Sequence, residues 1–499
     1  MYANICSKIL KKKSWRIVAM FAAAAFFLVW IGNPHVQRQS EPFQSNVTVS
    51  DVIHNYQAES FAAIPDNMET LRDTGTISVI FGDDVNLAGD GEIMTFFTND
   101  EGEMMPVATA HDADLLAYNG DTVSIEYMQR SVSNNDYLPA EIYISEISVI
   151  QSDDAQNGVT GNTRWVNIAC RFGDRTDETP REMDYFENIL VNEAPGMDDY
   201  WRTTSAQLVN IEGSNAYGWY NLPRTKAEYL RMAAANTGAA LKALMTDCTN
   251  AAIEAEGVDF TQYGGINMML NDTFGCCAWG GRMALTIGGQ NISFRTTWLP
   301  PWAFNSLHVI AHEMGHGWGL PHSSGPYGKV YDSAWDVMSG GNSNHTDAIC
   351  RIGNDLGCWQ VGTIGFHLAM LGWIPDEQMV VVADGESATI EIDPLTTLET
   401  SDGTMVIFVP ISGNTFYTVE ARAFIDYDRN LPGEAVVLHQ VVPGRSSPAH
   451  VVDADNNGNP NDEGAMWRVG ETFTDSRAGI TISVVANEGN TVTVRIVND

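Results

Sequence analysis

The segment His308–His322 reads HVIAHEMGHGWGLPH and contains the pattern H-E-x-x-H-x-x-G-x-x-H. His312 and His316 are separated by one helical turn, so on a helix both imidazoles lie on one face and can reach one metal ion. Glu313 follows the first of them and is expected to act as the general base on a metal-bound water. The spacing therefore predicts a helix that carries one catalytic zinc ion.

The end of this helix supplies the third predicted ligand, His322. Gly319 is expected to stop the helix, because glycine tolerates the positive φ that a sharp turn needs. Pro321 then prevents the helix from resuming. Three neutral imidazoles leave one position on zinc open, as a catalytic site requires. His308 precedes His312 by one turn and is interpreted as a surface or supporting residue rather than a ligand.

A second element, WDVMSGG (Trp335–Gly341), places Met338 in a Gly/Ser-rich turn after the third histidine. The combination of the histidine pattern with a downstream Met turn resembles the metzincin clan of zinc peptidases. More narrowly, it is similar to the gametolysin and immune-inhibitor-A-like secreted peptidases. The resemblance implies that Met338 forms an apolar floor beneath the three imidazoles.

The resemblance extends over about residues 164–499, with FHLAMLGWIP (Phe366–Pro375) similar to the helix that closes such catalytic domains. His322 stands where the immune-inhibitor-A group usually has an acidic residue, so the gametolysin-like pattern fits better. No tyrosine closely follows Met338, so the extra tyrosine ligand of some metzincins is not expected. Residues 41–169 contain no cysteine, which excludes a cysteine-switch propeptide. Any latency must use another group.

The pattern of strands and helices along the chain predicts an α+β multidomain protein. Short alternating strands precede residue 152, strands and long helices alternate around the histidine pattern, and strands return after Pro375. We therefore expect a signal peptide or anchor (1–40), a small N-terminal β domain that is a propeptide or accessory module (41–160), a metzincin-type α/β catalytic domain (161–375) and a jelly-roll-like C-terminal β-sandwich (376–499).

Within the predicted catalytic domain, a long helical pattern over residues 225–256 is interrupted near Asn236 and Gly238, where a break is possible. The strand-like stretch AWGGRMALTIGG (278–289) lies upstream of the histidine helix. Peptidases usually bind a peptide as an added strand on a sheet edge. This stretch is either that edge or an ordinary internal strand.

The N-terminus predicts export. A basic stretch, Lys8–Arg16, runs into the apolar segment 17–32, which is the order of a secretory signal. The alternatives are cleavage, giving a secreted protein, or an uncleaved membrane anchor formed by residues 17–32. In both cases the chain beyond about residue 40 is extracellular.

The cysteines agree with export. The chain has seven, of which Cys6 lies in the signal region, and the even remainder allows up to three disulfides. Cys350 and Cys358 are close enough to close a small loop. Cys276 and Cys277 are adjacent and are expected to find separate partners, with Cys170 and Cys248 as candidates.

The formal net charge of −36 would repel phosphate backbones and so argues against nucleic-acid binding. One acidic stretch has the oxygen spacing of a calcium loop, although its twelfth position is Gly464 and the EF-hand pattern is incomplete. It is either a calcium site or a polar loop. The candidate ligands are Asp453, Asp455, Asn457 and Asp462.

These features together predict an exported zinc endopeptidase that hydrolyses peptide bonds of extracellular proteins, with protein or peptide substrates as its partners. Membrane contact is expected only through an uncleaved N-terminal anchor. The alternative is a surface-associated binding or matrix protein with a catalytic-like domain of low activity. The intact Glu313 argues against this alternative, because loss of the base would be the first sign of decay.

Overall fold

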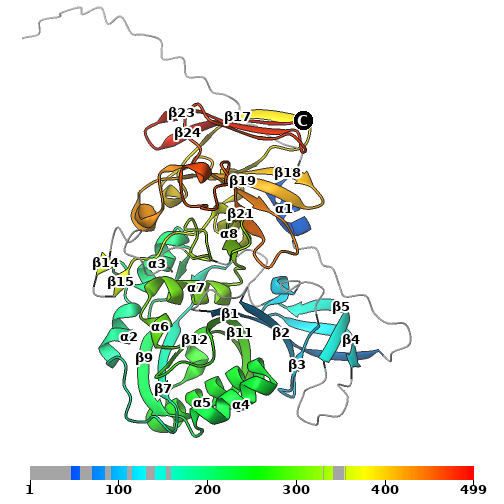
Figure 1. Ribbon diagram of the computed structural model, residues 1–499. Coiled ribbons are helices and arrows are strands. Elements are labelled where there is room, and N and C mark those ends of the chain that lie inside the picture. Colours follow the sequence, from blue (N-terminus) through cyan, green and yellow to red (C-terminus); the bar gives the residue numbers. More distant parts are fainter. Residues whose placement is uncertain are drawn as a thin grey trace, which may run out of the picture. The chain divides into compact units, whose positions relative to one another are not determined.

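The computed structural model describes residues 47–56, 70–84, 91–108, 115–130, 141–152, 159–329, 331–340, 353–354 and 356–499. Over these ranges it is a mixed α/β protein with several sheets (Figure 1). The predicted signal or anchor, residues 17–32, lies outside them. None of the helices in the described ranges is both long and apolar enough to cross a membrane.

The largest sheet has ten strands and joins the N-terminal strands to those around the histidine pattern. Its order is β3-β2-β1-β11-β12-β10-β7-β9, and β4 pairs with both β1 and β5. The strands are β1 (Leu71–Asp84), β2 (Glu92–Asn99), β3 (Met104–Pro106), β4 (Thr122–Arg130), β5 (Glu141–Gln151), β7 (Trp165–Arg171), β9 (Asn215–Asn221), β10 (Gly265–Leu270), β11 (Cys277–Ile287) and β12 (Gln290–Leu299).

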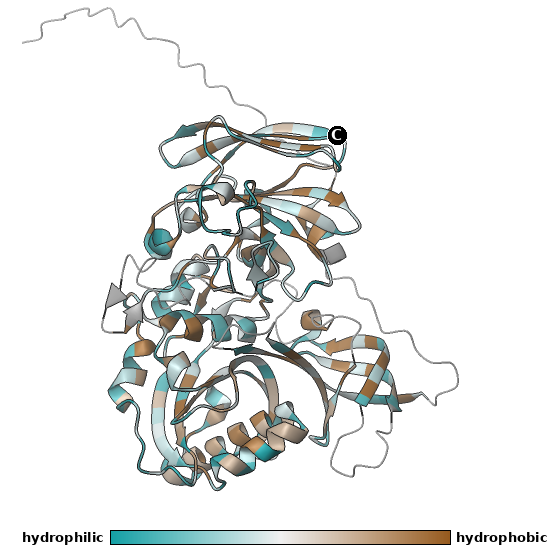
Figure 2. Ribbon diagram, viewed as in Figure 1, coloured by the Kyte–Doolittle hydropathy of each residue, from teal (hydrophilic) through white to brown (hydrophobic). Residues whose placement is uncertain are grey.

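The N-terminal strands have a small core of their own. Apolar residues alternate with polar ones along β4 and β5, as the striped colouring in Figure 2 shows. The inward side chains of β1, β2, β4 and β5 pack together and include Ile77, Phe97, Ile125 and Ile142. This layer is nevertheless continuous with the larger sheet, because β1 also pairs antiparallel with β11.

Helices cover both faces of the sheet beyond β11. One face, with Trp165 and Ala169 of β7, packs with residues of α7 (Leu307–Trp318). The other face, with Val166 and Ile168, packs with residues of α5 (Thr237–Glu256). The parallel strands β7 and β10 are buried almost throughout, which accounts for their nearly continuous apolar sequences.

The predicted long helix is divided into α4 (Lys226–Ala235) and α5 at the expected break. The side chain of Asn236 caps α5 by accepting a hydrogen bond from the amide of Ala239 at 2.8 Å. Gly238 is required for packing, because a Cβ there would lie 2.1 Å from the ring of Phe96.

The other helices and short strands are α1 (Val49–Tyr56), α2 (Met183–Ile189), α3 (Met197–Thr204), α6 (Pro301–Phe304), α8 (Gly365–Met370), β6 (Gly161–Asn162), β8 (Val209–Asn210), β14 (Gly353–Asn354) and β15 (Gly357–Cys358).

The C-terminal region consists of two sheets that share one apolar core, which includes Val419 and Leu438 from one sheet and Ile482 and Val494 from the other. Their orders are β13-β21-β20-β19-β18-β16 and β17-β24-β23-β22. The strands are β13 (Ser323–Ser324), β16 (Met379–Val381), β17 (Glu386–Ile392), β18 (Val406–Ser412), β19 (Thr415–Arg422), β20 (Ala435–Val441), β21 (Ala449–Val451), β22 (Thr472–Asp475), β23 (Ile480–Glu488) and β24 (Thr491–Asn498). Because β13 directly follows His322 and pairs with β21, this region anchors the loop of the third histidine.

The disulfides correct one expectation. Cys170 of β7 is bonded to Cys248 of α5, with their Cα atoms 6.1 Å apart, and Cys276 is bonded to its neighbour Cys277. The prediction that the adjacent pair has separate partners is therefore wrong. Cys170 and Cys248 face each other between strand and helix inside the core, which leaves the adjacent cysteines to pair together. The predicted Cys350–Cys358 bond lies outside the described residues.

Candidate metal centre

Helix α7 presents the first two predicted ligands from within the core. It begins after Ser306, whose side chain accepts a hydrogen bond from the amide of Val309, and it ends at Gly319, where φ is +98°. The amide of Leu320 donates to the carbonyl of Gly315 at 3.0 Å, which closes the last turn. The chain then reverses so that His322 returns toward the helix, as the glycine and proline in the sequence predict.

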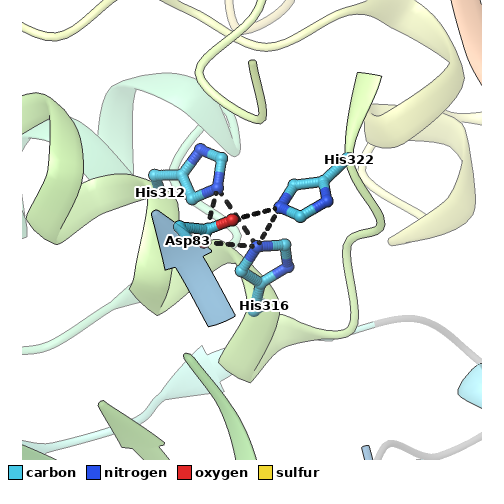
Figure 3. A group of neighbouring side chains, drawn as sticks. All are labelled: Asp83, His312, His316 and His322. Carbon is cyan, nitrogen blue, oxygen red and sulfur yellow. Dashed lines mark hydrogen bonds and ion pairs between the residues drawn. The ribbon is translucent and has the colours of Figure 1, made fainter. Parts of the chain in front are cut away.

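The three imidazoles converge on one point (Figure 3). The Nε2 atoms of His312 and His316 are 3.1 Å apart, and those of His316 and His322 are 3.0 Å apart. All three side chains are buried. Ligand nitrogens at about 2.0–2.1 Å from a tetrahedral zinc would be separated by about 3.3–3.4 Å. The observed spacing is close to this, so the group fits such an ion with small adjustments.

Backbone carbonyls orient two of the rings. Nδ1 of His312 lies 2.8 Å from the carbonyl oxygen of Val337, and Nδ1 of His316 lies 2.7 Å from that of Leu320. A carbonyl oxygen can only accept, so Nδ1 donates in each ring, and in the neutral imidazole the lone pair of Nε2 is then directed into the group. The two carbonyls thus select the tautomer that binds a metal.

Met338 lies directly beneath the turn of α7 between these two histidines. Its side chain is fully buried, and a Cβ added to Gly315 would lie 2.4 Å from its sulfur. Its carbonyl accepts a hydrogen bond from the amide of Ser323 at 3.0 Å, next to His322. Met338 therefore packs against α7 between the two helical histidines, and its role as a floor beneath the imidazoles stays a prediction.

A buried ion pair holds the Met turn in place. Asp336 is fully buried, and its Oδ2 lies 2.9 Å from Nδ1 of His367 in α8 and accepts from the hydroxyl of Ser323 at 2.6 Å. Burial raises the pKa of Asp336, but His367 and these hydrogen bonds outweigh it and hold the pKa well below its usual range. The charged carboxylate thereby ties the turn to both neighbouring segments.

Glu313 points into the same buried region. Its side chain is fully buried and lies next to the carboxylate of Asp83. Burial is the main cause that raises the pKa of Glu313 well above its ordinary value, and the charge of Asp83 is the second cause. On β11, Gly280 allows the strand to approach, because a Cβ there would lie 2.3 Å from the carbonyl oxygen of Glu313.

Asp83, which the sequence did not single out, completes the group (Figure 3). Its Oδ2 lies 3.2 Å from Nε2 of His312 and 3.5 Å from that of His316, and its Oδ1 lies 2.8 Å from Nε2 of His322. Burial alone would raise the pKa of Asp83, but His322 and His312 hold it well below its usual range. The described residues thus contain a buried group of one aspartate and three histidines that could hold a metal ion.

Tyr331 is a second residue that sequence reasoning missed. Its hydroxyl donates a hydrogen bond to Oδ1 of Asp83, and its ring lies edge-on to His312 and His322, with centroids 6.0 and 5.3 Å away. The tyrosine considered in the sequence would follow Met338, whereas Tyr331 precedes it. A left-handed backbone conformation, with φ at +55°, turns it toward the group.

His308 is not a member of the group. It is buried rather than exposed, and its Nε2 lies 3.1 Å from the carbonyl oxygen of Ser339 in the Met turn. Burial, followed by the charge of His312, lowers the pKa of His308 to about 4. Of the two interpretations of His308, a surface residue or a supporting residue, this buried position favours the supporting residue.

The predicted calcium ligands also lie together, on a loop of the C-terminal region. Carboxylate oxygens of Asp453, Asp455 and Asp462 are within 4.8 Å of one another. The amide nitrogen of Asn457 lies among them and donates to Asp455 at 2.9 Å and to Asp462 at 2.8 Å. The loop thus satisfies part of its own charge with amide hydrogens, and calcium binding stays a prediction.

No protein-family model matches this chain, and comparison with curated proteins gives no significant match.

Proposed function

We propose that the protein is an exported, zinc-dependent endopeptidase whose metal is held by His312, His316 and His322. The observation that carries this proposal is the convergence of three Nε2 atoms beside a buried glutamate, with backbone carbonyls orienting the rings of His312 and His316. Imidazole nitrogens in a compact set of this kind suit zinc. When bound, zinc supplies Lewis acidity that polarises a peptide carbonyl and acidifies water. The Cys170–Cys248 disulfide is in keeping with an oxidising, extracellular environment.

Glu313 is the group we assign to proton transfer. A general base works best when its pKa is near the working pH, and burial moves the pKa of this carboxylate upward. In this role the carboxylate takes a proton from water and returns it to the leaving amine.

Strand β11 is the surface that we propose for the substrate. It packs against α7 at Gly280, beside the metal centre, and its outer edge accepts β1 in antiparallel pairing from Ile80 opposite Gly281 to Asp84 opposite Cys277. An extended segment can therefore hydrogen-bond along this strand and reach the three histidines. A peptide substrate bound in the same manner would present its backbone to the metal.

The hydroxyl of Tyr331 is placed to help bind an oxygen at the centre. It donates to Oδ1 of Asp83, an oxygen that is also 2.8 Å from Nε2 of His322. A substrate carbonyl oxygen in the place of Oδ1 would receive the same hydrogen bond. Such a donor stabilises the negative charge that develops on that oxygen during hydrolysis.

The proposal is tested by casein cleavage with the full chain, before and after limited treatment with trypsin. We expect cleavage that is abolished by a zinc chelator, restored by added zinc, and lost in Glu313→Ala while the zinc content is unchanged. Glu377→Ala, an exposed acidic position, is the matched control. Undiminished cleavage by the Glu313 variant would overturn the proposal. A folded, zinc-loaded chain that cleaves nothing in any form would instead favour a binding or matrix protein.

A further inference from the structure

The most informative feature outside the histidine pattern is the end of β1. This strand lies about 230 residues before α7 in the sequence, yet it places two side chains in the metal centre. The ring of Phe81 stacks on the imidazole of His316, with centroids 4.0 Å apart and planes 6° from parallel. Asp83, on the same face of the strand, inserts its carboxylate among the three Nε2 atoms.

The surroundings of Asp83 call for a cation. Its carboxylate is buried and lies against the three imidazoles, the hydroxyl of Tyr331 and the carboxyl group of Glu313. The carboxylate of Glu313 is buried nearby. Two carboxyl groups buried side by side repel each other when both are charged. A divalent ion among the Nε2 atoms would neutralise this charge, and Asp83 would then be its fourth ligand.

Strand β1 also covers the strand that we assign to the substrate. Five consecutive residues, 80–84, pair with residues 277–281 of β11, which is the part of β11 beside α7. The approach is close at Gly82, where a Cβ would lie 2.7 Å from the indole nitrogen of Trp279. A peptide substrate would need the same edge and the same position at the metal.

We propose that the strand carrying Asp83 is a built-in inhibitor, in which the Asp83 carboxylate occupies the fourth position on the metal and β1 occupies the substrate strand. The chain is then latent until β1 is released from β11. This inference concerns the regulation of the site and rests on the proposed metal centre. It assigns to a carboxylate the blocking role that no cysteine in residues 41–169 can fill.

The test uses the full chain loaded with Co²⁺, whose absorption spectrum reports the ligands, and acetohydroxamate as a small probe of the fourth position. Asp83→Ala and the near-isosteric Asp83→Asn are compared with the wild type and with Asp84→Ala. Asp84 is the matched control, because it is the next acidic residue on the same strand and successive side chains alternate between faces. Asp83→Asn serves if the alanine variant fails to fold.

We expect both Asp83 variants to change the cobalt spectrum and to bind acetohydroxamate at least about tenfold more tightly than the wild type and Asp84→Ala, which corresponds to about 1.4 kcal/mol. We also expect them to cleave casein at least tenfold faster without trypsin. An unchanged spectrum and equal acetohydroxamate affinity in wild type and Asp83 variants would overturn the inference, as would the absence of cobalt binding to the wild type. Altered probe binding without casein cleavage in any form would support the role of Asp83 while contradicting the proposed peptidase.

Discussion

The described part of the chain contains two clusters of candidate metal ligands that differ in how they are held. The histidine group is buried, and carbonyls of Val337 and Leu320 fix the two helical imidazoles. The acidic loop is largely exposed, and Asp455 and Asp462 accept hydrogen bonds from the amide of Asn457 within the same loop. In the histidine group the carbonyl contacts leave the Nε2 atoms directed at one point, which prepares the group for a metal. In the acidic loop, hydrogen bonds from Asn457 already satisfy part of the carboxylate charge without a metal.

The largest expected effect separates the two clusters by their zinc content. His316→Ala removes the Nε2 atom that is closest to both other imidazoles, so we expect the zinc content to fall from about one per chain to near zero. Casein cleavage should fall by at least about a thousandfold. Asp462→Ala in the loop should leave the zinc content unchanged. Elemental analysis after dialysis measures the zinc content of both variants. Equal zinc loss in His316→Ala and Asp462→Ala would contradict the expected difference between the two clusters.

The second effect concerns the support beneath the histidines. Asp336→Asn leaves the buried His367 without its charged partner, and breaking such a pair costs about 3–5 kcal/mol of unfolding free energy. Asp455→Asn in the exposed loop should change it by less than about 1 kcal/mol. Urea unfolding monitored by tryptophan fluorescence compares the two variants. A small effect of Asp336→Asn would show that the pair does not stabilise the Met turn.

The same pair predicts a pH dependence. The pKa of Asp336 is depressed in the folded protein, so its contribution to stability is present above the ordinary aspartate pKa of about 3.9 and declines as the pH falls toward the lowered value. Asp336→Asn should lack this contribution. The difference in unfolding free energy between wild type and variant should therefore shrink below about pH 4, and a constant difference would contradict the assignment.

A smaller effect is expected at Tyr331. Tyr331→Phe keeps the ring against His312 and His322 but removes the hydroxyl that reaches Asp83. Loss of one donor to a developing oxyanion costs a factor of about 100–1,000 in kcat, and we expect the lower end for a site that also holds a metal. Tyr327→Phe, at the hydrogen bond to Asp453 in the loop, is the control and should not alter kcat.

The smallest effect tests the loop itself. If calcium binds to Asp453, Asp455 and Asp462, millimolar Ca²⁺ should raise the Tm by a few degrees, because a ligand stabilises the state that binds it. The shift should disappear in Asp455→Asn. Differential scanning calorimetry with and without Ca²⁺ is the measurement. An identical Tm in both conditions would show that the loop is a polar loop only.

Sequence patterns predicted the parts of the site that are close together in the chain. The ligand spacing, the glycine that ends α7 and the Met turn all lie between residues 307 and 340, so periodicity and turn chemistry were sufficient. The break at Asn236 was foreseen for the same reason. Asp83 and Tyr331 were missed, because their place depends on β1 pairing with β11 and on a left-handed residue inside a loop. Neither leaves a local signature in the sequence.

The disulfides show the same limit. Adjacency suggested separate partners for Cys276 and Cys277, but the pairing of Cys170 with Cys248 is set by how β7 packs against α5. The strands of the C-terminal region were recognised from their alternation, whereas the pairing of β13 with β21 beside His322 was not. Long-range contacts of this kind follow from tertiary packing.

Anomalous diffraction at the zinc edge, from crystals of the full chain grown with zinc, tests the central claim most directly. We predict one zinc peak at about 2.0–2.1 Å from the Nε2 atoms of His312, His316 and His322, with the Asp83 carboxylate as the fourth ligand and no zinc in the acidic loop. A structure with no metal between the three imidazoles, or with zinc only at the loop, would contradict the account.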